Sequence, residues 1–502
     1  MNSSASKIYL AVDLGATSGR VMAGFVSDET GKLVLEEMHR FPTTSIREGN
    51  SLFWDIRDIF SSIKTGLKIA AERFGERIQS VGVDSWAVDY GLIDEEGELL
   101  GNPHHYRDSR TDGMRAAVLE QVANERLWKE TGIQYLFFNT IYQLYAEVRS
   151  DPTRLSAAKR LLFIPDLINY WLTGKALQER TVASTSQLLN PITGAWSETL
   201  LEALELPTEL FAPVIEPGSV VADLMPEVVE ETGIRSASVV TIAGHDTASA
   251  FVALPGDGDD FAIMSSGTWS LIGLELDSPQ LSENAMEDGF SNEVGYAGTV
   301  RFLKNICGMW LIEQCLGAWK KAGRAYDYAE ALEMAESASP FGSLIDPDAP
   351  EFAAPESMPD AIAAFCERTN QPVPESDGAM LRCILESLAL KYRYVYRKLG
   401  QYASQPLKGL YMLGGGSRNE LLNQMTADAL GVPVVTGPVE ATAVGNIAVQ
   451  MIAHGAIQGL GEARELIGRS FDSKTFVPSE SGDFAAVAER FDALLRQADD
   501  LS

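Results

Sequence analysis

Residues 13–20 read Asp-Leu-Gly-Ala-Thr-Ser-Gly-Arg and lie between two apolar runs, residues 8–12 and 21–26. Each run has the length and apolar content of a buried strand. A short polar segment between two such strands predicts a β-hairpin. Gly15 and Gly19 are expected to take positive φ in its turn and to let a ligand approach the backbone closely.

The polar side chains of this octapeptide suit a phosphate ligand. Thr17, Ser18 and Arg20 offer hydrogen-bond donors to phosphate oxygens. Asp13, at the end of the first strand, is a candidate for holding a hydrated Mg²⁺ beside those phosphates. The segment therefore predicts a phosphate-binding hairpin, and an ordinary hairpin with polar turn residues is the alternative.

Length and charge bound the class of protein. A chain of 502 residues exceeds one hydrophobic core, so two domains of roughly 250 residues, or three smaller ones, are expected. A net charge of −30 argues against nucleic acid or an anionic membrane as partner. No apolar run approaches the ~20 residues of a membrane span, and no basic segment followed by an apolar one opens the chain. We expect a cytoplasmic protein.

Four cysteines, Cys307, Cys315, Cys366 and Cys383, lie in the second half of the chain. No Cys-x-x-Cys pair is present, so a structural zinc site is not expected. Buried free thiols are the favoured interpretation. A disulfide between Cys366 and Cys383 is the alternative.

The second half repeats the pattern of the first. An apolar run at 261–264 leads into the polar segment 265–270 and a returning run at 271–274, which again predicts a hairpin. Later strands at 80–86 in the first half and 409–413 in the second also end in polar or glycine residues. Each half is therefore expected to carry one hairpin and a later strand whose tip faces a ligand.

Helical periodicity separates these strands, with apolar residues at i, i+3 and i+4. The helical segments are 56–74, 380–399 and 420–430. Strands that alternate with helices imply a mixed α/β sheet in each half. The Pro-, Glu- and Gly-rich stretch 213–236 marks the expected boundary, which gives domains 1–240 and 241–502.

Gly414, Gly415 and Gly416 follow a strand and precede a helix that starts near Asn419. Such a backbone can approach a phosphate or a flat ring, and a helix N-terminus favours an anion. We favour nucleotide contact, with a tight strand-to-helix turn as the alternative. Neither a P-loop nor a dinucleotide fingerprint occurs in a strand-to-helix context.

The chemistry is best placed at Gly244, His245 and Asp246, between a strand at 239–243 and a helix at 247–252. A carboxylate at a helix N-terminus stays ionised, because the helix dipole and free N–H groups favour it. An ionised carboxylate can accept the proton of an attacking hydroxyl. Plain helix capping by Asp246 and a structural role for His245 are the alternatives.

The chain resembles the FGGY family of carbohydrate kinases over nearly its full length, and within that family it resembles the kinases of L-rhamnulose. The segments that carry the resemblance are 11–20, 106–113, 138–144, 245–250, 265–270 and 413–416. The second and third are the more specific to that subgroup. The resemblance implies an α/β fold with two ribonuclease-H-like domains of the actin and Hsp70 type flanking a cleft. It also implies ATP- and Mg²⁺-dependent phosphorylation of L-rhamnulose at O1, a step of L-rhamnose breakdown.

The resemblance also implies roles for individual residues. Asp246 matches the catalytic base. The nucleotide contacts are Ala16, Thr17, Ser18, Gly19, Arg20, Thr268, Gly414, Gly415 and Gly416, and the sugar contacts are Ala87, Asp89, His245, Asp246, Thr247 and Asn305. Trp86, Phe137 and Phe138 could wall the methyl group of a deoxy sugar, although core packing is the better interpretation for each.

Two positions depart from the family pattern. Ala87 stands where relatives usually carry glycine near the sugar, so its methyl group could trim the pocket or shift the backbone. Glu313 stands where relatives often carry glutamine near ATP, and a carboxylate there would repel phosphate, so Glu313 is left out of the site.

Other functions stay open at this point. One is a kinase for another ketose or polyol, such as fuculose, xylulose or glycerol. Another is an actin-like ATPase switch that drives partner binding, which the polar and aromatic residues near Asp246 disfavour. The oligomeric state is open between monomer and homodimer.

Overall fold

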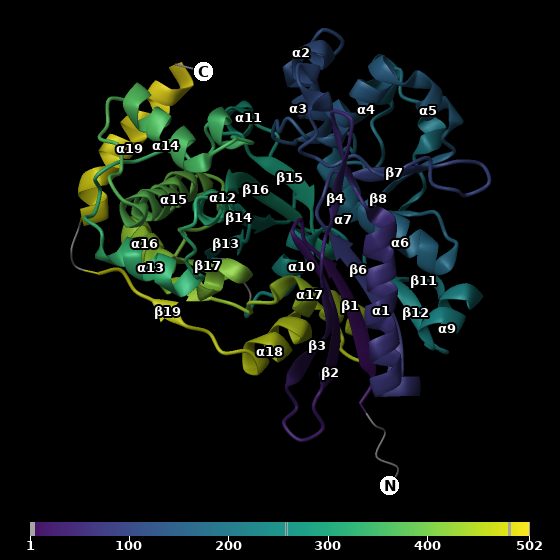
Figure 1. Cartoon of the computed structure of the whole chain (residues 1–502). Helices are drawn as coiled ribbons and strands as arrows, with labels where there is room; N and C mark the ends of the chain where they lie inside the picture. The colour runs from purple at the N-terminus through teal and green to yellow at the C-terminus, as the bar shows by residue number, and fades with distance from the viewer. Residues whose placement is uncertain (1–5, 257, 259, 480–482, 501–502) are drawn as a thin grey trace. The chain divides into compact units, whose positions relative to one another are not determined.

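The computed structural model describes residues 6–256, 258, 260–479 and 483–500, and Figure 1 shows their helices and strands as a cartoon. The chain divides into two compact units. Unit 1 comprises Met1–Asp257, Glu275–Phe302 and Glu440–Asp472, and unit 2 comprises Gly258–Leu274, Leu303–Val439 and Ser473–Ser502. The boundary after residue 240 stays a prediction.

A six-stranded sheet in the order β11-β12-β6-β1-β2-β3 forms the centre of unit 1. Its strands are β1 (Ile8–Leu14), β2 (Ser18–Val26), β3 (Leu33–Pro42), β6 (Ile78–Ser85), β11 (Ser219–Asp223) and β12 (Ser238–Thr241). Strands β1, β6 and β12 run parallel, whereas β1–β2, β2–β3 and β11–β12 are antiparallel. The hairpin predicted at the start of the chain is confirmed as β1–β2.

Helices cover both faces of this sheet. On one face, α1 (Ile56–Phe74) packs so closely that a Cβ at Gly66 would lie 2.4 Å from Val21. Side chains alternate between the two faces of a strand, so Arg20, which precedes Val21, points to the face opposite α1. Its register partner Asp13 points to that same face. There α17 (Ala441–Ala453) lies against β1 and β6. The helix predicted at 56–74 is confirmed, with Asp55 as its N-cap.

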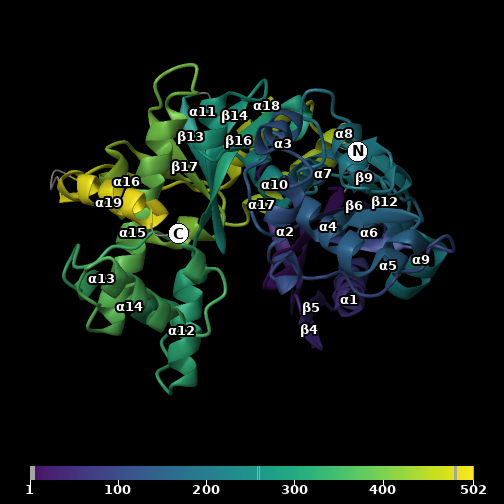
Figure 2. The same cartoon turned by 90° about the horizontal axis from the view of Figure 1, so that it is seen from above.

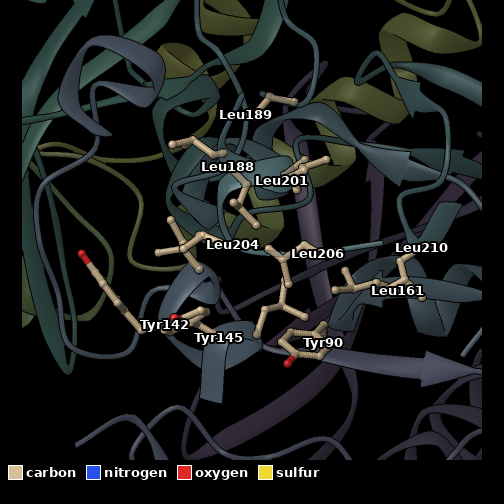
Figure 3. Close-up of a cluster of buried hydrophobic side chains, with 14 of the residues drawn as sticks. Tyr90, Tyr142, Tyr145, Leu161, Leu188, Leu189, Leu201, Leu204, Leu206 and Leu210 are labelled. Carbon is tan, nitrogen blue, oxygen red and sulfur yellow. The ribbon is translucent and has the colours of Figure 1, made fainter. Parts of the chain in front are cut away.

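Smaller elements complete unit 1. The strands are β4 (Ser45–Glu48), β5 (Ser51–Trp54), β7 (Tyr90–Ile93), β8 (Arg160–Phe163), β9 (Gln178–Glu179), β10 (Val214–Ile215) and β15 (Ser291–Val294). The helices are α2 (Met114–Leu119), α3 (Asn124–Thr131), α4 (Thr140–Ser150), α5 (Pro152–Ala157), α6 (Ile164–Thr173), α7 (Arg180–Ala183), α8 (Glu198–Ala203), α9 (Pro226–Thr232), α10 (Asp246–Val252), α11 (Glu283–Glu287) and α18 (Leu460–Ser470). A buried apolar cluster, part of which Figure 3 shows, packs α4 against β7, β8 and the leucines of residues 188–210.

The second sheet has the order β15-β16-β14-β13-β17-β18-β19. Its further strands are β13 (Phe261–Ser266), β14 (Trp269–Leu276), β16 (Val300–Cys307), β17 (Gly409–Leu413), β18 (Val434–Thr436) and β19 (Thr475–Phe476). From β16 to β19 this order matches β3-β2-β1-β6-β12-β11. The first hairpin is antiparallel, the next two pairs are parallel and the last pair is antiparallel in both sheets. The predicted repeat is confirmed.

The helices of unit 2 gather around its longest one, α15 (Asp377–Leu399), and both views show α16 and α19 beside it (Figures 1 and 2). The others are α12 (Trp310–Lys321), α13 (Tyr328–Ser337), α14 (Met358–Arg368), α16 (Glu420–Leu430) and α19 (Asp483–Asp500). All four cysteines are buried free thiols. Within the described residues, no helix combines the length and the apolar content needed to cross a membrane.

Candidate active site

The turn of the β1–β2 hairpin is held by Thr43, the residue after β3, rather than by left-handed glycines. The amide of Gly15 donates to the carbonyl of Ser18 over 3.1 Å, and the hydroxyl of Thr43 donates to the carbonyl of Gly15 over 2.9 Å. The prediction of positive φ at Gly15 and Gly19 is wrong, because neither residue has it. Gly19 is required for packing instead, since a Cβ there would lie 2.5 Å from the ring of Phe41.

Three charged side chains on three adjacent strands form a row at the end of this hairpin. Asp13 on β1 is the register partner of Arg20 on β2 and of Asp84 on β6, so all three point to the same face. Nε of Arg20 donates to Oδ2 of Asp13 over 3.1 Å. The guanidinium also pairs with Glu440, the residue before α17. Arg20, predicted to face phosphate, is therefore held between two carboxylates.

Burial raises the pKa values of the carboxyl groups in this row. Asp13 is 3% exposed and Asp84 is fully buried. Burial raises the pKa of Asp13 to about 6, although Arg20 opposes the shift. Burial and the neighbouring Asp13 raise the pKa of Asp84, against a hydrogen bond of 2.6 Å from the amide of Asn446. Oδ1 of Asp84 is buried without a hydrogen-bond partner among the described residues.

Asp246 is the first residue of α10 and is partly exposed. Its Oδ1 accepts from the amide and the hydroxyl of Thr247, over 2.6 and 3.2 Å. Nε2 of His245 lies 3.3 Å from the same oxygen. No hydrogen bond or ion pair from a described residue engages Oδ2. One carboxylate oxygen is thus anchored, and the other is available as a proton acceptor.

The loop before α10 is held from behind by Glu179. Oε2 of this buried carboxylate accepts from the amide of Gly244 over 3.0 Å and from the hydroxyl of Thr181 over 2.6 Å. That hydroxyl lies 3.2 Å from the amide of His245. A Cβ at Gly244 would lie 2.9 Å from Oε2 of Glu179, so glycine is needed there. These hydrogen bonds anchor the loop that leads into Asp246.

Asp89 sits at the centre of a buried hydrogen-bond cluster. Its Oδ2 accepts from the indole N–H groups of Trp54 and Trp86, over 2.6 and 3.1 Å. The amide of Tyr106 donates to Oδ2 over 3.1 Å, and the amide side chain of Gln143 donates to Oδ1 over 2.9 Å. Asp89 is fully buried. Burial raises its pKa to about 6, while the bonds from Trp54 and Gln143 oppose that shift.

The residue before Asp89 is backbone-strained. Val88 has a φ of 66°, a conformation that is costly for a β-branched residue. The amide of Asp89 closes this tight turn on the carbonyl of Ala87 over 2.9 Å. The hydroxyl of Thr140, at the start of α4, donates to the carbonyl of Val88 over 2.7 Å. The strained turn thus directs Asp89 inward, and α4 holds it.

Gln143 connects this cluster to a buried ion-pair network. Its oxygen accepts from Arg110 over 2.7 Å. Arg110 and Arg154 both donate to Oε1 of Glu147, over 2.9 and 3.1 Å, and Tyr90 donates to it over 3.2 Å. The two segments predicted to be most specific, 106–113 and 138–144, therefore meet in a charge network inside unit 1.

In unit 2, the structure constrains the three consecutive glycines differently. Gly414 has a φ of 79°, which favours glycine. A Cβ at Gly416 would lie 2.1 Å from the hydroxyl of Ser266 at the end of β13. Gly415 is unconstrained, since a Cβ there would meet nothing closer than 3.9 Å. Packing thus explains Gly414 and Gly416, and Gly415 leaves room beside the backbone.

The turn of the β13–β14 hairpin is braced from the end of β16. The carbonyl of Thr268 accepts from the amide of Gly308 over 3.1 Å. Asp348 accepts from the amide of Cys307 over 2.8 Å, and Nζ of Lys391 on α15 lies 3.0 Å from that carboxylate. A buried lysine therefore holds the strand end against which Thr268 rests.

The structure places the predicted site residues in both units. Unit 1 holds Asp13, Ala16, Thr17, Ser18, Gly19, Arg20, Ala87, Asp89, His245, Asp246 and Thr247, and unit 2 holds Thr268, Asn305, Gly414, Gly415 and Gly416. Within unit 1, the charge of Asp246 is one of the causes that raise the pKa of Asp13. Asn305 is half-buried on β16, and Glu313 is exposed on α12.

Sequence reasoning missed Asp84, Glu440, Glu293 and Arg301. Asp84 had a usable signal, since it ends an apolar strand as Asp13 does. Glu440, Glu293 and Arg301 had none, because a lone charge in or beside an apolar segment does not reveal its partner. Among the described residues, no group of three or more His, Cys, Asp or Glu side chains is arranged to hold a metal ion.

Comparisons with known proteins agree with this architecture. The N-terminal domain of the FGGY family of carbohydrate kinases matches residues 8–253, and its C-terminal domain matches residues 262–454. A rhamnulokinase of Bacteroides thetaiotaomicron is 43% identical over 488 residues, which cover 97% of this chain and 99% of that protein. A rhamnulokinase of Bacillus subtilis is 40% identical over 474 residues, which cover 94% of this chain and 96% of that protein.

Solved structures show the same fold at lower identity. A gluconate kinase from Lactobacillus acidophilus superposes with a TM-score of 0.79 at 17% identity, over 99% of this chain and 98% of that one. A xylulose kinase from the same organism gives 0.78 at 17% identity, over 99% and 97%. The predicted two-domain α/β sugar-kinase fold is confirmed. Taken with the family domains matched along the chain, these likenesses show that the protein belongs to the FGGY family of carbohydrate kinases.

Proposed function

We propose that the chain transfers the γ-phosphoryl group of ATP to the 1-hydroxyl of L-rhamnulose, giving L-rhamnulose 1-phosphate and ADP. The observation that carries this proposal is the near full-length likeness, at about 40% identity, to proteins described as rhamnulokinases. ATP as the phosphoryl donor follows from the family.

Asp246 is the proposed general base. Its Oδ1 is anchored by Thr247, so Oδ2 is the oxygen that takes the proton from the attacking sugar hydroxyl. Phosphoryl transfer needs little covalent help from the protein, and most of the acceleration comes from positioning and electrostatic stabilisation. The loop behind Asp246, held by Glu179, supplies the positioning.

The charged row of unit 1 fits a cation. Carboxylates outnumber Arg20 there, since Asp13, Asp84 and Glu440 all lie beside it. Oδ1 of Asp84 is buried without a partner. We propose that Asp13 holds a hydrated Mg²⁺, with Asp84 behind it. When bound, Mg²⁺ supplies positive charge that neutralises the phosphate oxygens.

Hydroxyls and backbone amides are the proposed phosphate and nucleotide contacts. In unit 1 these are the residues Ala16 to Arg20, where Thr17 is exposed and Ser18 is half-buried. In unit 2 they are Thr268 and the glycines Gly414 to Gly416. Gly415 is the glycine that the packing of unit 2 leaves open.

The proposed sugar contacts are Ala87, His245, Thr247 and Asn305, together with Asp89. Because Asp89 is fully buried and accepts bonds from two tryptophans, we propose that it shapes the sugar pocket from behind. Aromatic rings around it, including Trp86, then supply the apolar surface that a methyl group needs.

A panel of ketoses, assayed for ADP release with purified protein, ATP and Mg²⁺, tests the proposal. L-Rhamnulose should give the highest kcat/KM. Contacts to one methyl group are worth only about 1–3 kcal/mol, so other ketoses should be poor substrates rather than inert ones. L-Fuculose, xylulose or glycerol used about tenfold better than L-rhamnulose would refute the substrate and leave the kinase class standing. ATP turnover that is independent of any sugar would instead indicate an ATPase switch.

A further inference from the structure

A buried ion pair stands behind His245, and the proposed mechanism gives it no role. Arg301 is fully buried and Glu293 is 4% exposed. NH1 of Arg301 lies 3.0 Å from Oε2 of Glu293. Both charges lose their hydration on burial, which costs several kcal/mol per ion, on the order found for buried pairs. Such a pair needs a reason other than stability.

The guanidinium of Arg301 is fixed in orientation and directed at His245. Nε and NH2 both donate to the carbonyl of Val294, over 3.2 and 3.1 Å. Glu293 faces NH1. NH2 also lies 3.2 Å from Nδ1 of His245. Three sides of the guanidinium are therefore occupied, and one of its N–H groups is left for the imidazole.

These contacts select one tautomer of His245. A guanidinium can only donate, so the ring nitrogen that faces it must offer a lone pair. Oε2 of Glu293 also lies 3.2 Å from Nδ1. The other tautomer would direct an Nδ1–H at Glu293, but this N–H would also face the donating NH2 of Arg301. The single proton of the neutral ring then belongs on Nε2, which lies 3.3 Å from Oδ1 of Asp246.

We propose that Arg301 and Glu293 are positioning residues that hold His245 as its Nε2–H tautomer, so that this N–H engages Oδ1 of Asp246 and leaves Oδ2 to face the sugar hydroxyl. The catalytic consequence rests on the proposed function, whereas the tautomer does not. A carboxylate held through one oxygen keeps the direction of the other, and misplacing a reacting group by about 1 Å can cost on the order of 10²-fold in rate.

Histidine labelled with ¹⁵N in the full-length protein tests the tautomer directly. The chain contains five histidines, and the signals of His245 are those lost in His245→Gln. The pH is raised until the ring nitrogen shifts of His245 stop changing, which marks the neutral ring. The proposal expects the remaining proton on Nε2. A proton on Nδ1 overturns it. Because the wild-type protein gives this answer, the test stands even if a variant does not fold.

Kinetics test the consequence. Glu293→Gln weakens the ion pair with Arg301 and keeps the shape of the side chain at position 293. The matched control is Glu275→Gln, because Glu275 forms a comparable ion pair with Arg464 in the same unit, at 2.6 Å and with side chains 15% and 8% exposed.

We expect Glu293→Gln to lower kcat about tenfold or more, with KM for ATP within about twofold, since a positioning defect acts on the reacting groups. Glu275→Gln should keep kcat. Equal kcat in the two folded variants overturns the positioning role. If no ketose is phosphorylated by the wild type, the proposed function fails, and the tautomer measurement still decides the inference.

Discussion

The hairpins β1–β2 and β13–β14 hold the same place in two sheets of matching strand order, yet their ends carry different chemistry. In unit 1, Asp13 is in register with Arg20 on one side and with Asp84 on the other. In unit 2, the last register pair of the hairpin joins Ser266 and Ser270. Counted from the turn, the second register pair is Asp13 with Arg20 in unit 1 and Ser265 with Leu271 in unit 2. One hairpin therefore carries charged groups near its turn, and the other carries neutral ones.

This difference indicates that the two hairpin ends contribute differently, one to the chemical step and the other to ligand binding. Ionised groups can respond to the charge that moves during phosphoryl transfer, so they act on kcat. Neutral hydroxyls and closely packed glycines hold a ligand that is already charged, so they act mainly on its binding. On the proposed function, the reacting groups lie in unit 1, whereas unit 2 contributes only ligand contacts, and each prediction below tests that assignment.

The largest effect is expected at Asp246. Asp246→Asn should lower kcat by roughly 10² or more, because a near-isosteric amide cannot accept the proton, while KM for ATP stays close to wild type. Steady-state kinetics with L-rhamnulose measure both constants. Asp55→Asn is the matched control, since Asp55 caps helix α1 in the same unit. A variant that keeps more than about a tenth of kcat would remove Asp246 as the base.

Acid should act on the chemistry through Asp13 of unit 1. Burial raises the pKa of Asp13 to about 6, and its ionised form is the one that pairs with Arg20 and would hold a cation. Because the active form is the deprotonated one, kcat/KM should be retained above that pH and fall about tenfold per pH unit below it. Excess Mg²⁺ should move this fall to lower pH, since a cation favours the carboxylate. A flat profile down to about pH 5 would contradict the assignment.

In unit 2, Gly416→Ala should impair binding rather than chemistry. The new Cβ would lie 2.1 Å from the hydroxyl of Ser266, which forces the backbone of residues 415–418 to shift. We expect KM for ATP to rise about fivefold with kcat nearly unchanged, and stability to fall by about 1–3 kcal/mol. Gly415→Ala meets nothing closer than 3.9 Å and serves as the control for stability. A selective loss of kcat in Gly416→Ala would place chemistry in unit 2.

The smallest effect is expected at Ala87, where relatives were expected to carry glycine. Its φ is not positive, so glycine is not required by the backbone. Ala87→Gly should lower stability by about 0.5–1 kcal/mol through the entropy of the unfolded chain. It should change kcat/KM for L-rhamnulose by less than about threefold. Thermal unfolding and the ketose assay measure the two effects, and a tenfold change in kcat/KM would show that the methyl group trims the sugar pocket.

The sequence predicted the elements that follow from local patterns. Helices α1 and α16 begin and end at the predicted residues, and strand β17 does as well. Apolar periodicity and polar residues at strand ends are enough to predict these elements, because both signals lie within a few neighbouring residues. The repeat of the fold was predictable for the same reason.

Contacts between distant segments were not predictable in this way. Asp84 becomes a partner of Asp13 only because β6 lies beside β1, and the ion pair of Glu293 and Arg301 reaches His245 across the chain. The prediction of left-handed Gly15 and Gly19 was wrong, because Gly19 lies within β2 and Thr43, the residue after β3, binds the carbonyl of Gly15. These contacts depend on tertiary packing between distant segments, which local patterns in a single sequence do not reveal.

The product of the wild-type reaction tests the central claim most directly. Purified protein, L-rhamnulose, ATP and Mg²⁺ are incubated, and the sugar product is examined by ³¹P–¹H correlation NMR alongside ADP. The account predicts one sugar phosphate per ADP, with its phosphorus coupled to the two protons on C1. ADP without a sugar phosphate, or phosphorus coupled to another carbon's proton, would contradict it.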